Sequence, residues 1–153
     1  DRLLKAIDNG IRMGKITQRV IAQSGTSQYE PSLFEHKEFM PFEEMARLIE
    51  EAEIVVAHAG VGSTLVSLSF GKIPIIFPRM CGRRPTEHVD EHQMEFASQM
   101  AKQGHALVAF DEEDLLDKIV NYKALIGRLA VRPTRFDKGS LISFLRDVIE
   151  DKR

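Results

Sequence analysis

The stretch EIVVAHAGVGSTLVSLSFGKIPIIFP, residues 53–78, decides the fold. It opens with EIVVAHAG, whose continuous apolar run is typical of a strand buried on both faces in a parallel sheet. GSTLVSLSFG then predicts a helix, because Gly62 and Ser63 suit its start and Gly71 stands just past its end. The next letters, IPIIFP, predict a second buried strand. Strand, helix and strand in this order predict two parallel strands joined by a helix that covers the sheet.

The same alternation of strand and helix continues along the chain. Further strands are expected over residues 16–25, around Glu38–Met40 and over 105–110, and further helices over 2–13, 42–52, 88–103, 111–125 and 139–151. This order predicts an α/β fold, a Rossmann-like three-layer domain with helices on both faces of a parallel sheet. Ligands in such folds bind outside the carboxyl ends of the strands. The loops of interest therefore follow strands, at residues 24–36, 41–43, 58–63, 78–88 and 110–112.

The composition is that of a soluble globular protein. With 153 residues the chain is long enough for one domain with its own core, so we expect residues 1–153 to form a single domain. Apolar residues make up 43% and charged residues 29%, and the net charge of −2 gives no bulk basic signal for nucleic acid. Cys81 is the only cysteine, which excludes a disulfide within the chain and fits a reducing compartment such as the cytoplasm. No apolar run approaches the ~18–20 residues that span a bilayer, and no signal peptide is visible.

The turn HAGVGST is the first candidate binding site. It lies between a predicted buried strand and a predicted helix, where glycines let the backbone approach a ligand and free N–H groups favour a phosphate. Its candidate residues are His58, Ala59, Gly60, Gly62, Ser63 and Thr64. The dinucleotide fingerprint fails because Leu65 replaces the third glycine, and the P-loop fails because Ile73 follows Gly71-Lys72. By pattern alone, phosphate binding and a tight turn with an ordinary helix cap are about equally supported.

The stretch TEHVDEHQ, residues 86–93, is the second candidate site. It contains H-x-x-E-H, the zinc-protease signature of the inverzincins, with His88 and His92 spaced to face one metal from one helix. A third acidic ligand would also be needed, and nothing singles out one of the acids at 112–114. The motif also stands in a small α/β domain, whereas such enzymes are much larger. The metal interpretation is therefore the weaker one.

Polar recognition is the alternative for the same stretch. Carboxylates and amides such as Glu87, Asp90 and Gln93 exchange hydrogen bonds with hydroxyl groups, and Arg79 would orient the loop before them. A solvated helix start is the plainer explanation, since acids at that position need no ligand. Both explanations stay open at this point.

The segment of residues 118–138 is basic. It carries Lys118, Lys123, Arg128, Arg132, Arg135 and Lys138 against a single acid, Asp137. Such a segment could meet anionic lipid headgroups or a partner protein. A solvated basic face beside a packed helix is at least as well supported.

Two stretches together carry a family resemblance. EIVVAHAGVGSTLVSLSFGKIPIIFPR followed by EHVDEHQMEFASQMAKQG resembles the C-terminal domain of glycosyltransferase family 28, which is one half of a GT-B fold. The most similar branch is that of small donor-binding subunits in bacterial exopolysaccharide and capsule synthesis, with the soluble subunit of the dolichol-linked UDP-GlcNAc transferase as eukaryotic relative. The resemblance covers nearly the whole chain and is strongest over residues 53–104. The pairing of H-A-G-x-G-S with E-H-x-D-x-H-Q is specific, although neither motif would suffice alone.

The resemblance implies a role for each candidate position. The donor diphosphate and ribose would lie at His58, Ala59, Gly60, Gly62, Ser63 and Thr64, and the donor sugar at Glu87, Asp90, His92 and Gln93. The uracil and the rim of the cleft would lie at Phe42, Gln23, Gly25 and Ser27, with Arg79 in the loop before the sugar. These positions agree with the independent argument that loops after strands bind ligands.

The chain departs from the family pattern in two places. More distant relatives carry a ribose-binding glutamate where this chain has Val66, so ribose recognition must differ or be weaker. The family also has a strand and a Gly/Thr-rich turn before the letters FDRL. This chain opens at Asp1, without methionine and already in a helical pattern, which suggests that its natural start is missing. We therefore expect the first strand to be absent and one sheet position to be unfilled.

The resemblance implies an inverting transfer of a hexose or N-acetylhexosamine from a UDP-sugar to a lipid-linked acceptor. The acceptor base would lie on a membrane-anchored, acceptor-binding partner half at the cytoplasmic face of the membrane, and no metal or other cofactor is expected. Three alternatives stay open. The chain could be a non-catalytic enhancer or scaffold of a membrane glycosyltransferase, a UDP-sugar epimerase that needs acids from a second domain, or a zinc protease.

Overall fold

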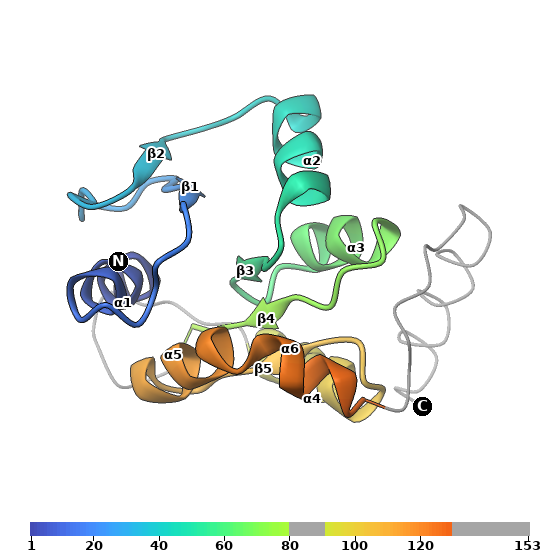
Figure 1. The fold of residues 1–153 in the computed structure, drawn as a ribbon. Coiled ribbons are helices and arrows are strands. Elements are labelled where there is room, and N and C mark those ends of the chain that lie inside the picture. The colour runs from blue at the N-terminus through green and yellow to red at the C-terminus, as the bar shows by residue number, and fades with distance from the viewer. Residues whose placement is uncertain (80–90, 130–153) are drawn as a thin grey trace.

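Helices and strands alternate in the computed structural model, which describes residues 1–79 and 91–129 (Figure 1). The elements are α1 (Arg2–Arg12), β1 (Ile21–Gln23), β2 (Glu35–Lys37), α2 (Phe42–Glu51), β3 (Val56–Ala57), α3 (Val61–Ser69), β4 (Ile75–Ile76), α4 (Glu91–Lys102), β5 (Leu107–Val108), α5 (Glu112–Val120) and α6 (Tyr122–Gly127). Each described strand pair is parallel, which confirms the α/β class. None of these helices is long and apolar enough to cross a membrane.

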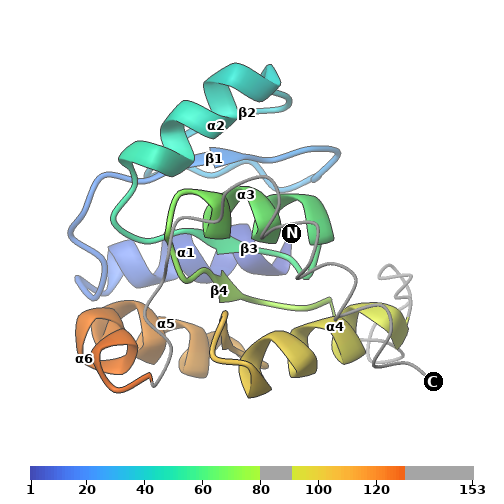
Figure 2. The same cartoon turned by 90° about the vertical axis from the view of Figure 1, so that its right-hand side faces the viewer.

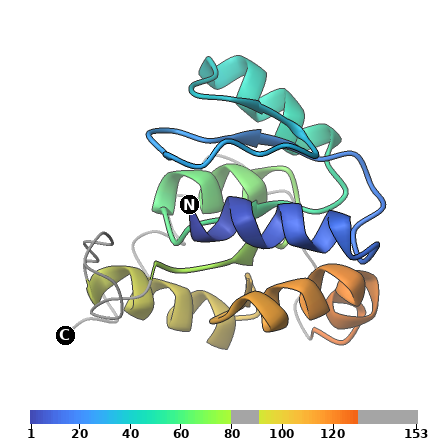
Figure 3. The same ribbon diagram turned by 90° about the vertical axis from the view of Figure 1, so that its left-hand side faces the viewer.

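Helices cover both faces of the sheet around β4. Ile75 and Phe77 pack with α1, α5 and α6 in one buried cluster, whereas Ile76 packs with α3 and α4 in another. This division follows from the strand repeat, because successive side chains point to opposite faces of a sheet. Figure 3 shows α1 lying along α5. These two helices form one of the outer layers. The three-layer arrangement predicted from the sequence is therefore present.

The parallel strands form two separate ladders. β3, β4 and β5 form one sheet in that order, and β1 pairs only with β2. Figures 1 and 2 show the β1–β2 pair beyond β3, on the side away from β5. In a doubly wound sheet, a further strand lies between the positions that β1 and β3 occupy here. Residues 1–79 and 91–129 supply no such strand. The expected unfilled sheet position therefore lies between β1 and β3.

The first two strands differ from the sequence-based expectation. The prediction of a strand around Glu38–Met40 is wrong. β2 is instead the polar stretch Glu35–Lys37, which is exposed throughout. Pairing with β1 sets its position, with Ile21 opposite Glu35 and Gln23 opposite Lys37. A strand at the edge of a sheet satisfies its backbone on one side and needs no apolar side chains to do so.

Other boundaries also moved. β1 is shorter than the expected 16–25, because Ile16 folds back after α1 and is buried in the core beside it. The helix expected over 111–125 is divided at Asn121 into α5 and α6. The first residues of the helix expected over 88–103, and all of the helix expected over 139–151, lie outside the described residues.

Candidate functional site

The carboxyl ends of the strands bring distant segments together, as the sequence predicted. The ring of His58, just after β3, lies with its Nδ1 2.9 Å from the backbone oxygen of Phe77, just after β4. A carbonyl oxygen only accepts hydrogen bonds, so Nδ1 carries the proton that is donated here. This bond joins the two loops that leave β3 and β4.

The start of α3 presents open backbone donors. Gly60 is the N-cap and, as a glycine, has no side chain with which to cap the helix. The hydroxyl groups of Ser63 and Thr64 turn back and donate to the Gly60 oxygen, at 3.2 and 3.0 Å. The first N–H groups of a helix have no partner within it, and residues 60–63 are exposed. Free N–H groups and the helix dipole favour an anion at such a position.

The two glycines of this turn are not required by the fold. Gly60 has a φ of −81°, which any residue can adopt, and Gly62 is not among the glycines with positive φ. A Cβ atom added at Gly60 would lie 3.5 Å from the nearest atom, and one added at Gly62 would meet nothing within 4 Å. Neither backbone strain nor crowding therefore accounts for these glycines. Close approach of a bound group to the backbone would account for them.

The remaining members of this turn face inward. Ala59 is 3% exposed and Thr64 is fully buried, and Ala59 belongs to the core cluster beneath α3. His58 is half-buried. Of the six residues predicted for the diphosphate, the exposed ones are therefore Gly60, Gly62 and Ser63.

The residues predicted for the uracil and the cleft rim lie around the ends of β1 and β2. Phe42, in the first turn of α2, is 67% exposed. The side-chain oxygen of Gln23 accepts a hydrogen bond from the Met40 N–H at 3.0 Å, which ties the end of β1 to the approach to α2. Gly25 has a φ of +58°, in the left-handed region that glycine adopts most readily. α2 in turn contacts α3.

Two aspartates that the sequence analysis did not single out hold the loop after β1. Asp1 accepts from the Ser27 hydroxyl at 2.5 Å and from the Gln28 N–H at 3.1 Å. Asp8 is fully buried and accepts from the Tyr29 hydroxyl at 2.6 Å, from the Leu33 N–H at 3.1 Å and from both donors of Ser32. Burial alone would raise the pKa of Asp8, but these hydrogen bonds outweigh it and hold the pKa below its ordinary value.

The residues predicted for the donor sugar are only partly described. Glu87, Asp90 and the His92 side chain lie outside the described residues, and Arg79 is exposed where the described chain leaves β4. Gln93, in the first turn of α4, has a buried side-chain oxygen with no hydrogen-bond partner. A buried acceptor of this kind is costly unless a donor such as a hydroxyl group satisfies it.

The described residues give little support to the hypothesis of a zinc site. Within residues 1–79 and 91–129, no three His, Cys, Asp or Glu side chains gather as a metal site. Two of the acids offered as a third zinc ligand have other contacts, since Glu112 lies 3.9 Å from Arg2 and Asp114 pairs with Lys118. His88 lies outside the described residues.

The basic segment is also partly paired. Lys118 bonds to Asp114 within α5, and Lys123 lies 2.8 Å from Glu53. These contacts favour a solvated basic face for the described part of the segment. Residues 130–138 lie outside the description.

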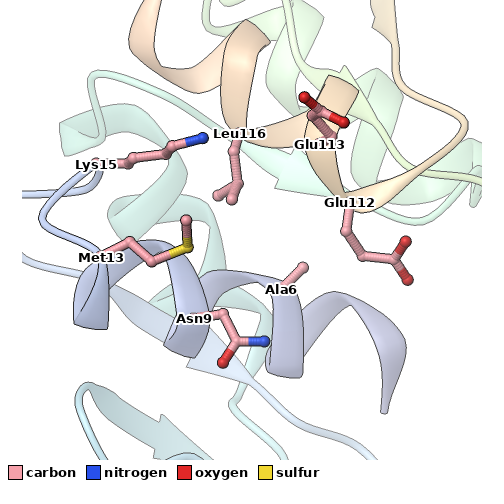
Figure 4. A pocket seen from close by; sticks show the side chains of 7 residues that line it. All are labelled: Ala6, Asn9, Met13, Lys15, Glu112, Glu113 and Leu116. Carbon is pink, nitrogen blue, oxygen red and sulfur yellow. The ribbon is translucent and has the colours of Figure 1, made fainter.

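A separate cavity of about 310 Å³ lies between α1 and α5 (Figure 4). Ala6 and Leu116 give it apolar walls, and Met13, Lys15, Glu112 and Glu113 surround them. None of the residues predicted for the donor lines it, so it is not part of the candidate site.

Comparisons with known proteins agree with the resemblance noted in the sequence. The family model described as "Glycosyltransferase family 28 C-terminal domain" matches residues 3–140. A UDP-N-acetylglucosamine transferase subunit, ALG13, from Yarrowia lipolytica is 30% identical over 73 residues. That match covers 48% of this chain and 34% of the relative, so the chain spans well under two thirds of that relative's length. No solved structure matches.

Proposed function

The chain belongs to the glycosyltransferase family 28 C-terminal domain family, and from that premise we propose that residues 1–153 are its UDP-sugar donor-binding domain. The domain would serve an inverting transferase that moves a hexose or N-acetylhexosamine to a lipid-linked acceptor. Two findings support the proposal: the family match and the relative named as a subunit of a UDP-N-acetylglucosamine transferase.

One observation carries the proposal, namely the open start of α3. Its N-cap residue supplies no capping side chain, and its two glycines are needed neither for backbone conformation nor for packing among the described residues. An anion that approaches the backbone explains both features at once. The diphosphate of a UDP-sugar carries the negative charge that this position favours.

The proposed chemistry places developing charge at the same helix start. The acceptor oxygen attacks the anomeric carbon from the face opposite UDP, and the bond from that carbon to the diphosphate oxygen breaks. The electrons of that bond remain on UDP, where the N–H groups of α3 and its dipole stabilise them. The acceptor proton passes to a base, which we assign to the partner half.

The other predicted residues would hold the rest of the donor. Phe42, Gln23, Gly25 and Ser27 would border the uracil, with the loop fixed by Asp1. Glu87, Asp90, His92 and Gln93 would read the sugar hydroxyls, and the unsatisfied oxygen of Gln93 supports its place in this set. The Val66 side chain offers no hydrogen bond to ribose, so ribose recognition would differ from that of the more distant relatives or be weaker.

The partner would be a membrane-anchored, acceptor-binding half at the cytoplasmic face. The relative is named a subunit, which supports a divided enzyme. This chain alone is then expected to bind nucleotide and to transfer little or no sugar. The alternative is a scaffold subunit that stabilises its partner and leaves the nucleotide site empty.

Calorimetric titration with UDP, UDP-GlcNAc, UDP-Gal and UDP-Glc tests the proposal. We expect UDP to bind and one of the three UDP-sugars to bind more tightly than the other two. The three sugars differ at C2 or C4, and one set of hydrogen-bonding side chains suits one arrangement of these groups best. No heat with any of the four would support the scaffold alternative instead, provided that circular dichroism shows a folded chain.

A further inference from the structure

Arg2, the first residue of α1, reaches across the carboxyl ends of β4 and β5. Its Nη2 donates to the Pro78 oxygen at 2.7 Å, just after β4, and its Nη1 donates to the Phe110 oxygen at 3.3 Å, just after β5. The side chain is only 13% exposed. One guanidinium thus fixes three segments that are far apart in the sequence.

The same guanidinium also lies on the residue that holds His58. Its central carbon is 4.0 Å from the centre of the Phe77 ring, and that ring is fully buried. The backbone oxygen of Phe77 accepts the hydrogen bond from the His58 ring at 2.9 Å. A continuous series of contacts therefore runs from Arg2 through Phe77 to His58, beside the start of α3.

Structural ion pairing explains little of this arrangement. The carboxylate that the structure places against Arg2 belongs to Glu112, at 3.9 Å, and its side chain is 48% exposed. The shorter contacts go to carbonyl oxygens and to an aromatic face, which suit the planar, forked donors of arginine and not the single ammonium of lysine. The Arg2 side chain therefore serves chiefly to fix the main chain at Pro78 and Phe110.

We infer that Arg2 is a positioning residue for the donor site. It holds the main chain at Pro78, which precedes Arg79 and the stretch proposed to bind the sugar, residues 86–93, in the sequence. Through Phe77 it also holds the His58 ring. This inference rests on the proposed function, since the held segments matter only if they meet the donor. Neither the sequence pattern nor the family match assigns Arg2 a role.

The test compares Arg2→Met and Arg2→Lys with Arg12→Met, a control in the same helix. Arg12 is exposed and, in the described part of the chain, hydrogen-bonds to Asn9 in its own helix, so its loss leaves the strand ends untouched. The first readout is the nitrogen NMR signals of the His58 ring in the ligand-free protein. The second is the ratio of the affinity for the preferred UDP-sugar to the affinity for UDP.

We expect both Arg2 variants to shift the His58 signals and to lower the affinity ratio by about tenfold. The reason is that the main-chain oxygens of Pro78 and Phe110 lose the hydrogen bonds from the charged guanidinium. The Arg12 variant should change neither. Unchanged His58 signals, or an unchanged ratio in a folded Arg2→Met protein, would overturn the inference and leave Arg2 a stability residue. If the unaltered protein binds no nucleotide, the proposed function fails and the inference about the donor site fails with it; a shift of the His58 signals then shows only that Arg2 orders the strand ends.

Discussion

Asp8 shows how a single side chain organises a loop near the site. It lies on the apolar face of α1, four residues after Leu4, and is buried, and its hydrogen bonds to the described residues come from uncharged donors. Its hydrogen bonds instead come from the loop between β1 and β2, which joins two parallel strands without the usual helix. The carboxylate therefore stabilises a crossover that has no helix of its own.

Replacing this carboxylate should make stability less dependent on pH. Because the folded pKa of Asp8 lies below 3.8, its contribution is present above about pH 4 and is lost as the pH falls through the folded value. We expect Asp8→Asn to lower the free energy of unfolding by about 2–3 kcal/mol at pH 7, since an amide cannot accept all these bonds. Urea titrations of both proteins between pH 7 and pH 2.5 measure the difference.

Glu30→Gln is the control, because Glu30 is an exposed carboxylate in the same loop. Its stability should follow that of the unaltered protein closely. A difference between Asp8→Asn and the unaltered protein that stays constant down to pH 2.5 would contradict the account of Asp8.

At the scale of elements, the contact between α1 and α5 depends on a glycine. A Cβ atom at Gly10 would lie 2.5 Å from a methyl carbon of Leu116 and 2.8 Å from one of Ile16. Both neighbours are buried in the core. The two helices therefore approach as closely as they do because position 10 has no side chain.

Gly10→Val should destabilise the fold by about 1–3 kcal/mol, because the added methyl groups overpack the core. Gly127→Val is the matched control, since a Cβ there meets nothing within 4 Å. The measurement is the midpoint of chemical unfolding. Equal midpoints for the two variants would show that the α1–α5 contact can open at little cost.

The elements differ in how well the sequence predicted them. Helix α2 and the unit from β3 to β4 were predicted because buried strands are apolar runs and helices carry an apolar stripe. β2 could not be predicted in this way, because the sequence EHK has no apolar pattern and its place depends on pairing with β1. The break at Asn121 was missed for a similar reason, since α5 and α6 continue one charged and apolar pattern.

The candidate site shows the same division at the scale of the whole molecule. The start of α3 was predicted because its signal, glycines between a strand and a helix, is local in the sequence. Arg2 was missed because its contacts lie 76 and 108 residues away and leave no local pattern. Asp8 carried one usable signal, a charged residue on the apolar face of a helix.

The whole domain contributes one wall of a cleft in the proposed account. Its strand ends gather the α3 start, the approach to α2 and the exit of β4 on one side. The sheet is divided between β1 and β3 among the described residues, at the place where the family resemblance predicts a further strand. In that account, the diphosphate site rests on the loops that follow β3 and β4.

Binding of UDP to Gly62→Asp, with Gly127→Asp as control, tests the central claim most directly. An aspartate in the first turn suits the helix dipole, so Gly62→Asp should fold at least as well as the unaltered protein. Its carboxylate would occupy the position of the diphosphate, and we predict a loss of UDP affinity of roughly a hundredfold or more, whereas Gly127→Asp binds normally. Unchanged UDP affinity in folded Gly62→Asp would contradict the assignment of the diphosphate to the start of α3.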